Sequence, residues 1–214
     1  MVYLKRFRVE EENESAGVDE INSLVYRRGT DVFFWVDVSR QSIIRLVEVL
    51  HEATEEALVA KKKKLRSGKK VEPCVHLYIQ SYGGDAFAGI SAMAHIRNNR
   101  VKVVTIADGM VASAATLMLL GGVERYITPF SHVLIHQLTA GFYGKHQDLR
   151  DEYLNASNVM RSLSAIYVNE TGLSERRVKK MLRKELDLTS DQCIKYGIVH
   201  GVFPPPVSIC VTAV

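Results

Sequence analysis

The sequence predicts an α/β domain in which helices cover a mainly parallel sheet. The main indication is an alternation of apolar strands and helices in the middle of the chain, which implies right-handed crossovers. The three strand–helix steps are Val75–Ser81 into Asp85–Arg97, Val101–Ile106 into Val111–Leu120, and Tyr126–His136 into a long helix. The chain has 214 residues, of which 47% are hydrophobic and 24% are charged. These values suit one globular domain with a sizeable core.

The N-terminal part combines a polar arm, a strand and a helix. Residues 1–24 are of mixed composition, and the acidic stretch 10–17 is expected to form a mobile arm or loop. Val32–Val36 predicts a first apolar strand, and Ser39 is a suitable N-cap for the helix that follows. The apolar face of that helix comprises Ile43, Ile44, Leu46, Val47, Leu50 and Ala53.

This helix is expected to end before a basic run at residues 61–70, where seven of ten residues are Lys or Arg. We interpret the run as a solvated loop, with contact to an acidic partner or a nucleic acid as the alternative. No aromatic residues interleave with the charges, so base stacking has no support and a nucleic-acid partner is not expected.

The C-terminal part contains a helix that is long for a crossover. Apolar residues recur at spacings of three and four over Lys145–Thr171, although a plain surface helix has the same periodicity. The tail 204–214 begins with a proline run, and both packing on a neighbouring subunit and a disordered terminus are consistent with it. The predicted organisation is an arm over 1–24, a domain over 25–203 and a tail over 204–214.

The composition argues against several classes of protein. No apolar run reaches the ~20 residues of a membrane helix, and the N-terminus carries no apolar signal region. Cys74, Cys193 and Cys210 lack metal-ligand spacing. We therefore expect free thiols in a reducing compartment, the cytoplasm or the interior of an organelle, and no metal or other cofactor.

The stretch from Gly109 to Ala115 supplies the candidate nucleophile. It places one hydroxyl, that of Ser113, among small residues where an apolar strand turns into an apolar helix. Backbone N–H groups are free at a helix N-terminus, and the helix dipole favours a developing oxyanion there. Serine is also a common N-cap, so capping or packing is the alternative role for this residue.

Two further segments end predicted strands. Gly83-Gly84 follows one strand, and a glycine pair permits a tight turn with an N–H directed outward. His136 follows the apolar run of another strand, where a purely structural role is the alternative. Open α/β folds place their sites at strand ends. Together the three segments therefore predict an oxyanion donor, a nucleophile and a general base.

This set of segments, in this order, resembles the proteolytic subunit of the Clp protease, the ClpP family of self-compartmentalised serine peptidases. The resemblance covers about residues 31–203. The matching motifs are Gly83-Gly84, Gly109-Met110-Val111-Ala112-Ser113, Leu134-Ile135-His136-Gln137, and Leu188-Thr189-Ser190 followed by Lys195-Tyr196-Gly197-Ile198-Val199. The fold that the resemblance implies is a β-β-α superhelix, shared with crotonases, with a protruding handle over about 141–171.

The resemblance also implies a mechanism, an assembly and partners. Ser113 attacks a peptide carbonyl, His136 acts as the general base, and the N–H groups of Gly83 and Ala114 hold the oxyanion. Two stacked heptameric rings, joined through their handles, enclose the sites. The substrates are unfolded polypeptides, fed by an ATP-dependent AAA+ unfoldase. Residues 141–144 pair with the substrate backbone or form a flexible hairpin.

The sequence departs from the family pattern at two places. The catalytic Asp of the family falls on Glu185, and an aromatic two residues later falls on Asp187. A glutamate can orient a histidine. We expect Glu185 to complete the triad, with Asp187 as the alternative acid and engagement of neither as a third case. In the docking pocket for the unfoldase, Tyr78 matches one aromatic, but Asn98 replaces another and makes that wall polar.

Two alternatives to an active serine endopeptidase follow from these observations. The first is a catalytically weakened ring subunit with a structural role, and the substitution at Glu185 supports it. The second is a crotonase-like acyl-CoA enzyme, because that superfamily shares the β-β-α superhelix and a paired N–H oxyanion hole. The acyl-CoA chemistry does not need the pair of Ser113 and His136.

Overall fold

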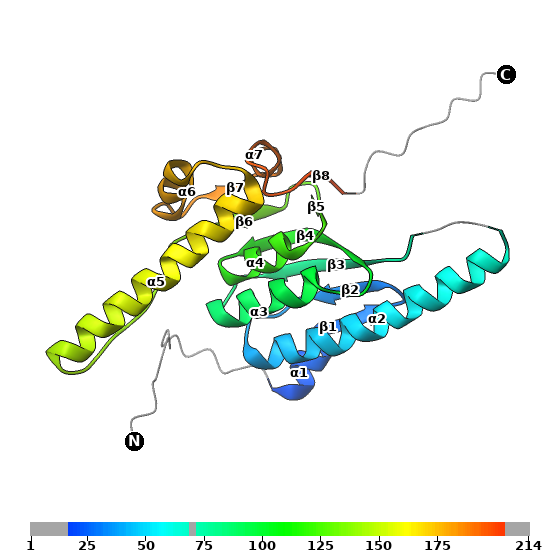
Figure 1. Ribbon diagram of the computed structural model, residues 1–214, viewed down its shortest axis with the longest axis horizontal. Coiled ribbons are helices and arrows are strands. Elements are labelled where there is room, and N and C mark those ends of the chain that lie inside the picture. Colours follow the sequence, from blue (N-terminus) through cyan, green and yellow to red (C-terminus); the bar gives the residue numbers. More distant parts are fainter. Residues whose placement is uncertain (1–16, 69–71, 204–214) are drawn as a thin grey trace.

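The computed structural model describes residues 17–68 and 72–203, and these form one sheet with helices packed on it (Figure 1). The strands are β1 (Val25–Arg28), β2 (Asp31–Phe34), β3 (Cys74–Ser81), β4 (Lys102–Ala112), β5 (Glu124–Ile127), β6 (His132–Leu134), β7 (Asp187–Leu188) and β8 (Gly201–Val202). The helices are α1 (Val18–Leu24), α2 (Arg40–Arg66), α3 (Ala86–Arg97), α4 (Ala114–Gly121), α5 (His146–Thr171), α6 (Glu175–Leu182) and α7 (Ser190–Lys195). The predicted α/β class is confirmed.

The sheet is mainly parallel, with the strand order β1-β2-β3-β4-β5-β8. Only the β1–β2 and β6–β7 pairs among the described strands are antiparallel. The long central strand β4 has two successive neighbours: residues 104–107 pair with β5, and residues 110–112 pair with β6. The second half of β4 therefore carries the chain toward β6, away from the edge occupied by β5 and β8.

The core lies between the sheet and helices α2, α3 and α4. In β3 the side chains of Val75, Leu77 and Ile79 are fully buried and alternate with half-buried His76 and Tyr78. This alternation is the period of two expected of a strand with one face on the core. Helix α4 is buried along its whole length, so it forms the centre of the helical layer. Each fully buried Leu or Ile side chain contributes about 1.5–3 kcal/mol to folding.

Two predicted boundaries are wrong. The sequence predicts that the helix of the second strand–helix step begins at Val111, but β4 continues through Ala112 because it pairs with β6, and α4 begins at Ala114. The predicted strand 126–136 is divided into β5 and β6, which are separated by a turn at residues 128–131. Phe130 adopts a positive φ of 64° in this turn. Both errors arise because pairing partners decide where a strand ends.

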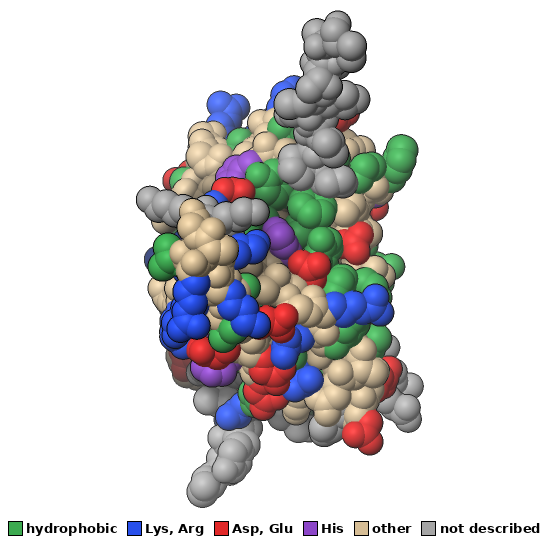
Figure 2. All heavy atoms as spheres, turned by 90° about the vertical axis from the view of Figure 1, so that its right-hand side faces the viewer, with side chains coloured by type: hydrophobic (Ala, Val, Ile, Leu, Met, Phe, Trp, Pro, Cys, Tyr) green, Lys and Arg blue, Asp and Glu red, His purple; other side chains and the backbone are tan. Residues whose placement is uncertain are grey.

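Helix α2 is longer than the sequence predicts. Ser39 is its N-cap, as predicted, and forms a reciprocal capping box with Ser42. The helix continues to Arg66, so the prediction of a helix end before residue 61 and of a loop in the basic run is wrong for residues 61–66. Lys and Arg are good helix formers and are favoured near a helix C-terminus. The last buried residue of α2 is Ala57. The basic end therefore projects from the body, where Figure 2 shows Lys and Arg side chains gathered.

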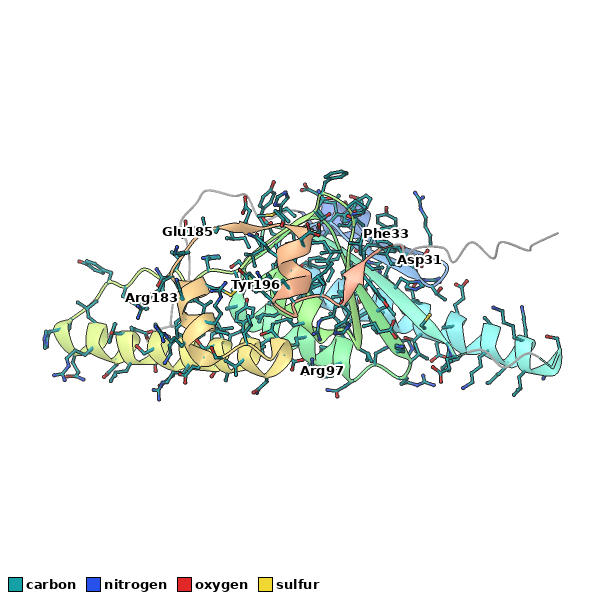
Figure 3. The ribbon with its side chains drawn as sticks, turned by 90° about the horizontal axis from the view of Figure 1, so that it is seen from above. Asp31, Phe33, Arg97, Arg183, Glu185 and Tyr196 are labelled. Atoms are coloured by element: carbon teal, nitrogen blue, oxygen red, sulfur yellow. The ribbon has the colours of Figure 1, made fainter. Side chains whose placement is uncertain are left out.

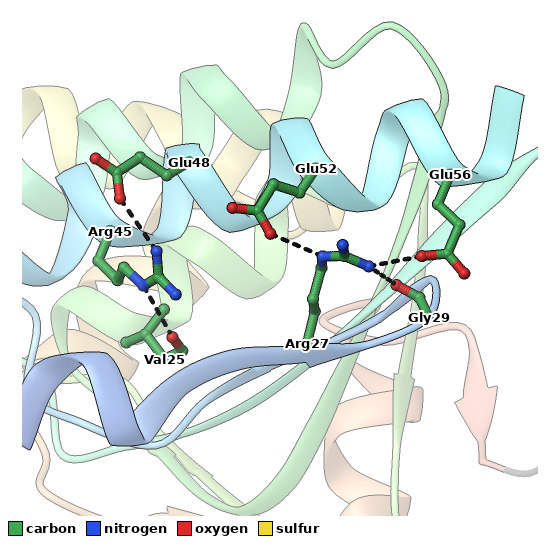
Figure 4. A network of polar contacts seen from close by, with 7 residues as sticks. All are labelled: Val25, Arg27, Gly29, Arg45, Glu48, Glu52 and Glu56. Atoms are coloured by element: carbon green, nitrogen blue, oxygen red, sulfur yellow. Dashed lines mark hydrogen bonds and ion pairs between the residues drawn. The ribbon is translucent and has the colours of Figure 1, made fainter. Parts of the chain in front are cut away.

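Acidic residues of α2 form ion pairs with arginines of β1 and of α2 itself (Figure 4). Arg27 on β1 donates to Glu52 at 2.9 Å and to Glu56 at 2.6 Å. Arg45 donates to Glu48 at 3.2 Å. Within residues 17–68 and 72–203 no ion pair reaches Lys61–Lys64. The basic end of α2 thus keeps its positive charge exposed.

The predicted long helix is confirmed as α5, whereas the segments at the two chain ends are described only in part. Residues 18–24, assigned to the arm by the sequence, form α1, which packs on α2 and buries Ile21. Residues 1–16 and the tail 204–214 lie outside the described residues. Residues 141–144 have no regular secondary structure. No helix among the described residues has the length and apolar character needed to cross a bilayer.

A buried arginine fixes the C-terminal end of α5 to the sheet. Arg125 on β5 is 7% exposed, and its guanidinium donates to the carbonyls of Ile198 at 2.9 Å, Glu170 at 2.9 Å and Gly197 at 3.1 Å. Burial lowers the pKa of Arg125 from its usual value, and Glu170 opposes that shift. The three carbonyls come from segments that are distant in the sequence.

Arg125→Met is expected to destabilise the protein by about 3 kcal/mol, because it leaves one buried and two part-buried carbonyls without their donor. The free energy of unfolding in urea measures this loss. Lys179→Met is the control, since Lys179 pairs with Glu175 at 2.5 Å on the exposed face of α6. An exposed pair of this kind contributes about 0.5 kcal/mol. Equal losses in the two variants would contradict the role assigned to Arg125.

Candidate active site

Ser113 stands alone between β4 and α4 in a strained backbone conformation. Its φ of 55° and ψ of −126° make it one of two non-glycine residues with positive φ in the described chain. Such conformations cost about 1–3 kcal/mol and concentrate at functional sites. The Ser113 N–H donates to the carbonyl of Leu134 at 2.9 Å, which ties the junction to β6. The strain is thus maintained by pairing with a neighbouring strand.

The side chain of Ser113 is not used as a helix cap. The residue occupies the N-cap position of α4, but its hydroxyl accepts no capping hydrogen bond, and the side chain is half-buried. Capping, the alternative that the sequence left open, is therefore not its role in this structure. Helix α3 packs closely on the first turn of α4 at Gly89. A Cβ on Gly89 would lie 2.8 Å from the carbonyl oxygen of Ala114.

Gly83 lies directly against Ser113, as the sequence predicts. A Cβ on Gly83 would lie 2.6 Å from the Ser113 Cβ and 3.1 Å from the Ala114 nitrogen. The N–H of Gly83 is already engaged, since it donates to the Ser81 hydroxyl at 3.1 Å. Ala114 is the first residue of α4, and its N–H has no partner within the helix. Of the two predicted oxyanion donors, only that of Ala114 has no hydrogen-bond partner within residues 17–68 and 72–203.

The structure adds a donor that the sequence did not single out. The N–H of Gly84 has no hydrogen-bond partner among the described residues, whereas Gly83 and Asp85 on either side are held to Val38. The Gly83 carbonyl accepts from the Val38 N–H at 2.7 Å, and the Asp85 N–H donates to the Val38 carbonyl at 2.8 Å. The glycine pair in the sequence is the signal that could have included Gly84 with Gly83.

His136 lies two residues after the end of β6, the strand that pairs with the end of β4. Its Nδ1 is buried and has no hydrogen-bond partner among the described residues. No hydrogen bond joins His136 to Ser113 in the described part of the chain. A buried ring nitrogen without a partner is uncommon. In a triad it is the nitrogen that a carboxylate orients.

Neither candidate acid is joined to His136 by a described hydrogen bond, but the strand register distinguishes them. Asp187 pairs with Leu134 across the antiparallel β6–β7 pair. Continuing that register by two residues brings Glu185 opposite His136, and opposite residues in antiparallel strands have neighbouring side chains. Glu185 is exposed and lies where α6 leads into β7 (Figure 3). The register therefore favours Glu185 over Asp187.

No group of three or more His, Cys, Asp or Glu residues within the described ranges is placed to hold a metal ion. A model of the family described as Clp protease matches residues 30–205. The chain belongs to the Clp protease family. The resemblance predicted from the motifs is confirmed, and the matched range includes every candidate site residue.

Two curated relatives are both named ATP-dependent Clp protease proteolytic subunit 2. The chain is 32% identical to the protein of Treponema denticola over 130 residues, which are 60% of this chain and 65% of the relative. It is 37% identical to the protein of Borreliella burgdorferi over 131 residues, which are 60% of this chain and 66% of the relative. The aligned part thus spans just under two thirds of the length of these Clp relatives.

The residues assigned to an unfoldase pocket lie apart in the single chain. Tyr78 on β3 stacks on Phe33 with ring centroids 5.0 Å apart, and Phe33 stacks on Tyr26 at 4.9 Å. These rings lie on the sheet face away from the helices, where Figure 3 shows Phe33. Asn98 is the exposed C-cap of α3, which belongs to the helical layer. Phe203 completes the aromatic group by an edge contact with Tyr78, a contact that the sequence does not predict.

Proposed function

We propose that this Clp-family chain is a serine endopeptidase subunit that hydrolyses unfolded polypeptides to short peptides. The single observation that carries the proposal is the strained Ser113, which lies against Gly83 and beside the free N–H of Ala114. Among the described residues the Ser113 hydroxyl makes no capping hydrogen bond to α4. The strained conformation presents a hydroxyl at the start of a buried helix, where the helix dipole favours negative charge.

The mechanism follows from the groups around Ser113. His136 takes the proton of the Ser113 hydroxyl as the oxygen attacks a peptide carbonyl. The Ala114 N–H, with a second donor from the Gly83-Gly84 corner, stabilises the tetrahedral oxyanion, and one such donor contributes about 3 kcal/mol. His136 then protonates the leaving amine, and water releases the acyl group from Ser113. No hydrogen bond joins His136 to Ser113 among the described residues. The mechanism therefore requires the His136 ring to form a hydrogen bond with the Ser113 hydroxyl when substrate binds.

Labelling of the purified protein with a serine-reactive fluorophosphonate tests this function. We expect a single adduct on Ser113, mapped by mass spectrometry, together with hydrolysis of a fluorogenic peptide. Binding of coenzyme A without any adduct would instead support the crotonase-like acyl-CoA enzyme. Absence of both adduct and hydrolysis would favour the weakened structural subunit, which is supported by the lack of a hydrogen-bond partner for the His136 Nδ1 among the described residues.

The acid of the triad is expected to be Glu185. Glu185→Gln should lower kcat by about 10³- to 10⁴-fold, because His136 loses the group that orients it and stabilises its charged form. Asp187→Asn is the matched control and should change kcat by less than about threefold, since the register places Asp187 opposite Leu134. Initial rates on the fluorogenic peptide measure both variants. A larger loss in Asp187→Asn would assign the role to Asp187, and no loss in either would mean that neither acid is engaged.

The assembly is proposed to be two stacked heptameric rings that enclose the active sites. Leu149, Tyr153 and Leu154 are exposed on the N-terminal half of α5, which extends from the body and offers an apolar surface for the opposite ring (Figure 1). The proposed partner is an AAA+ unfoldase that docks on the aromatic face around Tyr78, in a cytoplasmic or organellar compartment. Seven-fold rings in negative-stain images would support this assembly, and a monomer at micromolar concentration would contradict it.

A further inference from the structure

A buried chain of hydroxyl groups connects helix α5 to the backbone of Ser113. The Thr116 hydroxyl on α4 donates to the Ser113 carbonyl at 2.6 Å, and the Thr116 N–H donates to the same oxygen at 3.0 Å. The Tyr167 hydroxyl on α5 lies 2.5 Å from the Thr116 hydroxyl oxygen. Thr116 is fully buried and Tyr167 is 4% exposed. Two polar side chains thus occupy an otherwise apolar helix contact.

The direction of each hydrogen bond follows from counting protons. The Ser113 carbonyl can only accept, so the single hydroxyl proton of Thr116 is committed to it. Tyr167 must therefore donate its own proton to Thr116. Burial raises the pKa of Tyr167 to about 12, so the phenol keeps this proton at neutral pH. The chain runs from Tyr167 through Thr116 to the Ser113 carbonyl.

The Ser113 carbonyl and the Ala114 N–H belong to the same peptide group. A peptide group is planar, and its C=O and N–H point in opposite directions. Holding the Ser113 carbonyl on the Thr116 side therefore aims the Ala114 N–H away from Thr116, out of the start of α4. The direction of the proposed oxyanion donor is thus set by what binds the carbonyl behind it.

Packing alone does not require these hydroxyls. Phe and Val have nearly the same shape as Tyr and Thr, and a buried polar pair costs free energy unless its hydrogen bonds are complete. The end of α5 is itself held in place, because Arg97 on α3 donates to Glu170 at 2.6 and 2.7 Å. Tyr167 lies three residues before Glu170 on the same helix and is buried, so the position of its hydroxyl is held by the packing of α5.

We infer that Thr116 and Tyr167 are positioning residues, which fix the Ser113–Ala114 peptide plane so that the Ala114 N–H points at the oxyanion. This inference rests on the proposed function of Ser113 as a nucleophile. It assigns the last turns of α5 a role in catalysis that is separate from any contact between rings.

The test compares four variants by the rate of fluorophosphonate labelling at Ser113, by kcat and KM on a fluorogenic peptide, and by thermal stability. Thr116→Val should lower the labelling rate and kcat about tenfold with KM unchanged, because the oxyanion donor loses its aim. Tyr167→Phe should lower both about threefold. Thr116→Ser keeps a hydroxyl and should recover most of the loss.

Thr105→Val is the matched control for stability. Thr105 is also fully buried, and its hydroxyl donates to the Leu119 carbonyl at 2.7 Å, at the opposite end of α4. This variant should lose as much thermal stability as Thr116→Val but label at the wild-type rate. The contrast separates a general loss of packing in α4 from misdirection of the Ala114 N–H.

Each outcome decides between defined alternatives. Wild-type labelling rates in Thr116→Val and Tyr167→Phe would overturn the inference and leave the proposed function intact. Rates that fall equally in Thr105→Val would also overturn it. A wild-type protein that is not labelled at Ser113 would overturn the proposed function, and the inference with it. If Thr116→Val does not fold, the pair of Tyr167→Phe and Thr116→Ser still tests the inference.

Discussion

Ser113→Ala is expected to lower peptide hydrolysis by a factor on the order of 10⁶ and to remove the fluorophosphonate adduct completely. The change deletes the only hydroxyl between β4 and α4 and leaves the backbone free to keep its ties to Leu134 and Thr116. The fold should therefore survive, with a thermal midpoint close to that of the wild type. Hydrolysis is followed with a fluorogenic peptide at saturating concentration.

The control for this variant is Ser67→Ala, which deletes an exposed hydroxyl that donates to the Lys64 carbonyl at the end of α2. It should hydrolyse the peptide at the wild-type rate. A Ser113→Ala protein that retains full activity, after removal of any contaminating peptidase, would end the proposed mechanism. A partial loss of only a few-fold would contradict the role of Ser113 as nucleophile in the same way.

Gly83→Ala is expected to have the second largest effect, a loss of peptide hydrolysis of at least about 10²-fold. The new Cβ would lie 2.6 Å from the Ser113 Cβ and 2.8 Å from the Ala112 carbonyl oxygen, so Ser113 must be displaced. Gly83 also has a φ of 103°, which side-chain-bearing residues rarely adopt. Displacement of Ser113 moves both the nucleophile and the Ala114 N–H, and stability should fall as well.

Gly141→Ala provides the comparison, because a Cβ on Gly141 would meet no atom within 4 Å. That variant should retain wild-type stability to within about 0.5 kcal/mol. The two proteins are compared by circular dichroism, by urea unfolding and by the rate of fluorophosphonate labelling. If Gly83→Ala were labelled at the wild-type rate, the close contact between the glycine corner and Ser113 would not matter for the chemistry.

The local patterns of the sequence were sufficient for the elements that depend on local interactions. The capping box of Ser39 and Ser42 and the period-two burial of β3 both act within a few residues, so they can be read from a linear sequence. The apolar periodicity of α5 belongs to the same class. The predicted end of α2 is wrong because a run of lysines does not by itself indicate a loop: lysines are compatible with a helix C-terminus.

Contacts between distant segments decided the rest. The boundary between β4 and α4 depends on pairing with β6, which makes Ser113 a single junction residue rather than a position inside a helix. The buried contact of Thr116 with Tyr167 likewise cannot be predicted from sequence spacing. Tyr167 is 51 residues from Thr116, and only the packing of α5 on α4 brings them together.

The sequence by itself determined the α/β class, the family and the three segments that carry Ser113, Gly83 and His136, because each signal is short and local. Only the tertiary structure decided how these groups are aimed. The strained φ of Ser113, the start of α4 at Ala114 and the β6–β7 register, which sets Glu185 opposite His136 when it is extended by two residues, all depend on strands and helices that meet across long stretches of chain. The direction in which a side chain or a backbone N–H points depends on the packing around it, and that packing involves segments that are distant in the sequence.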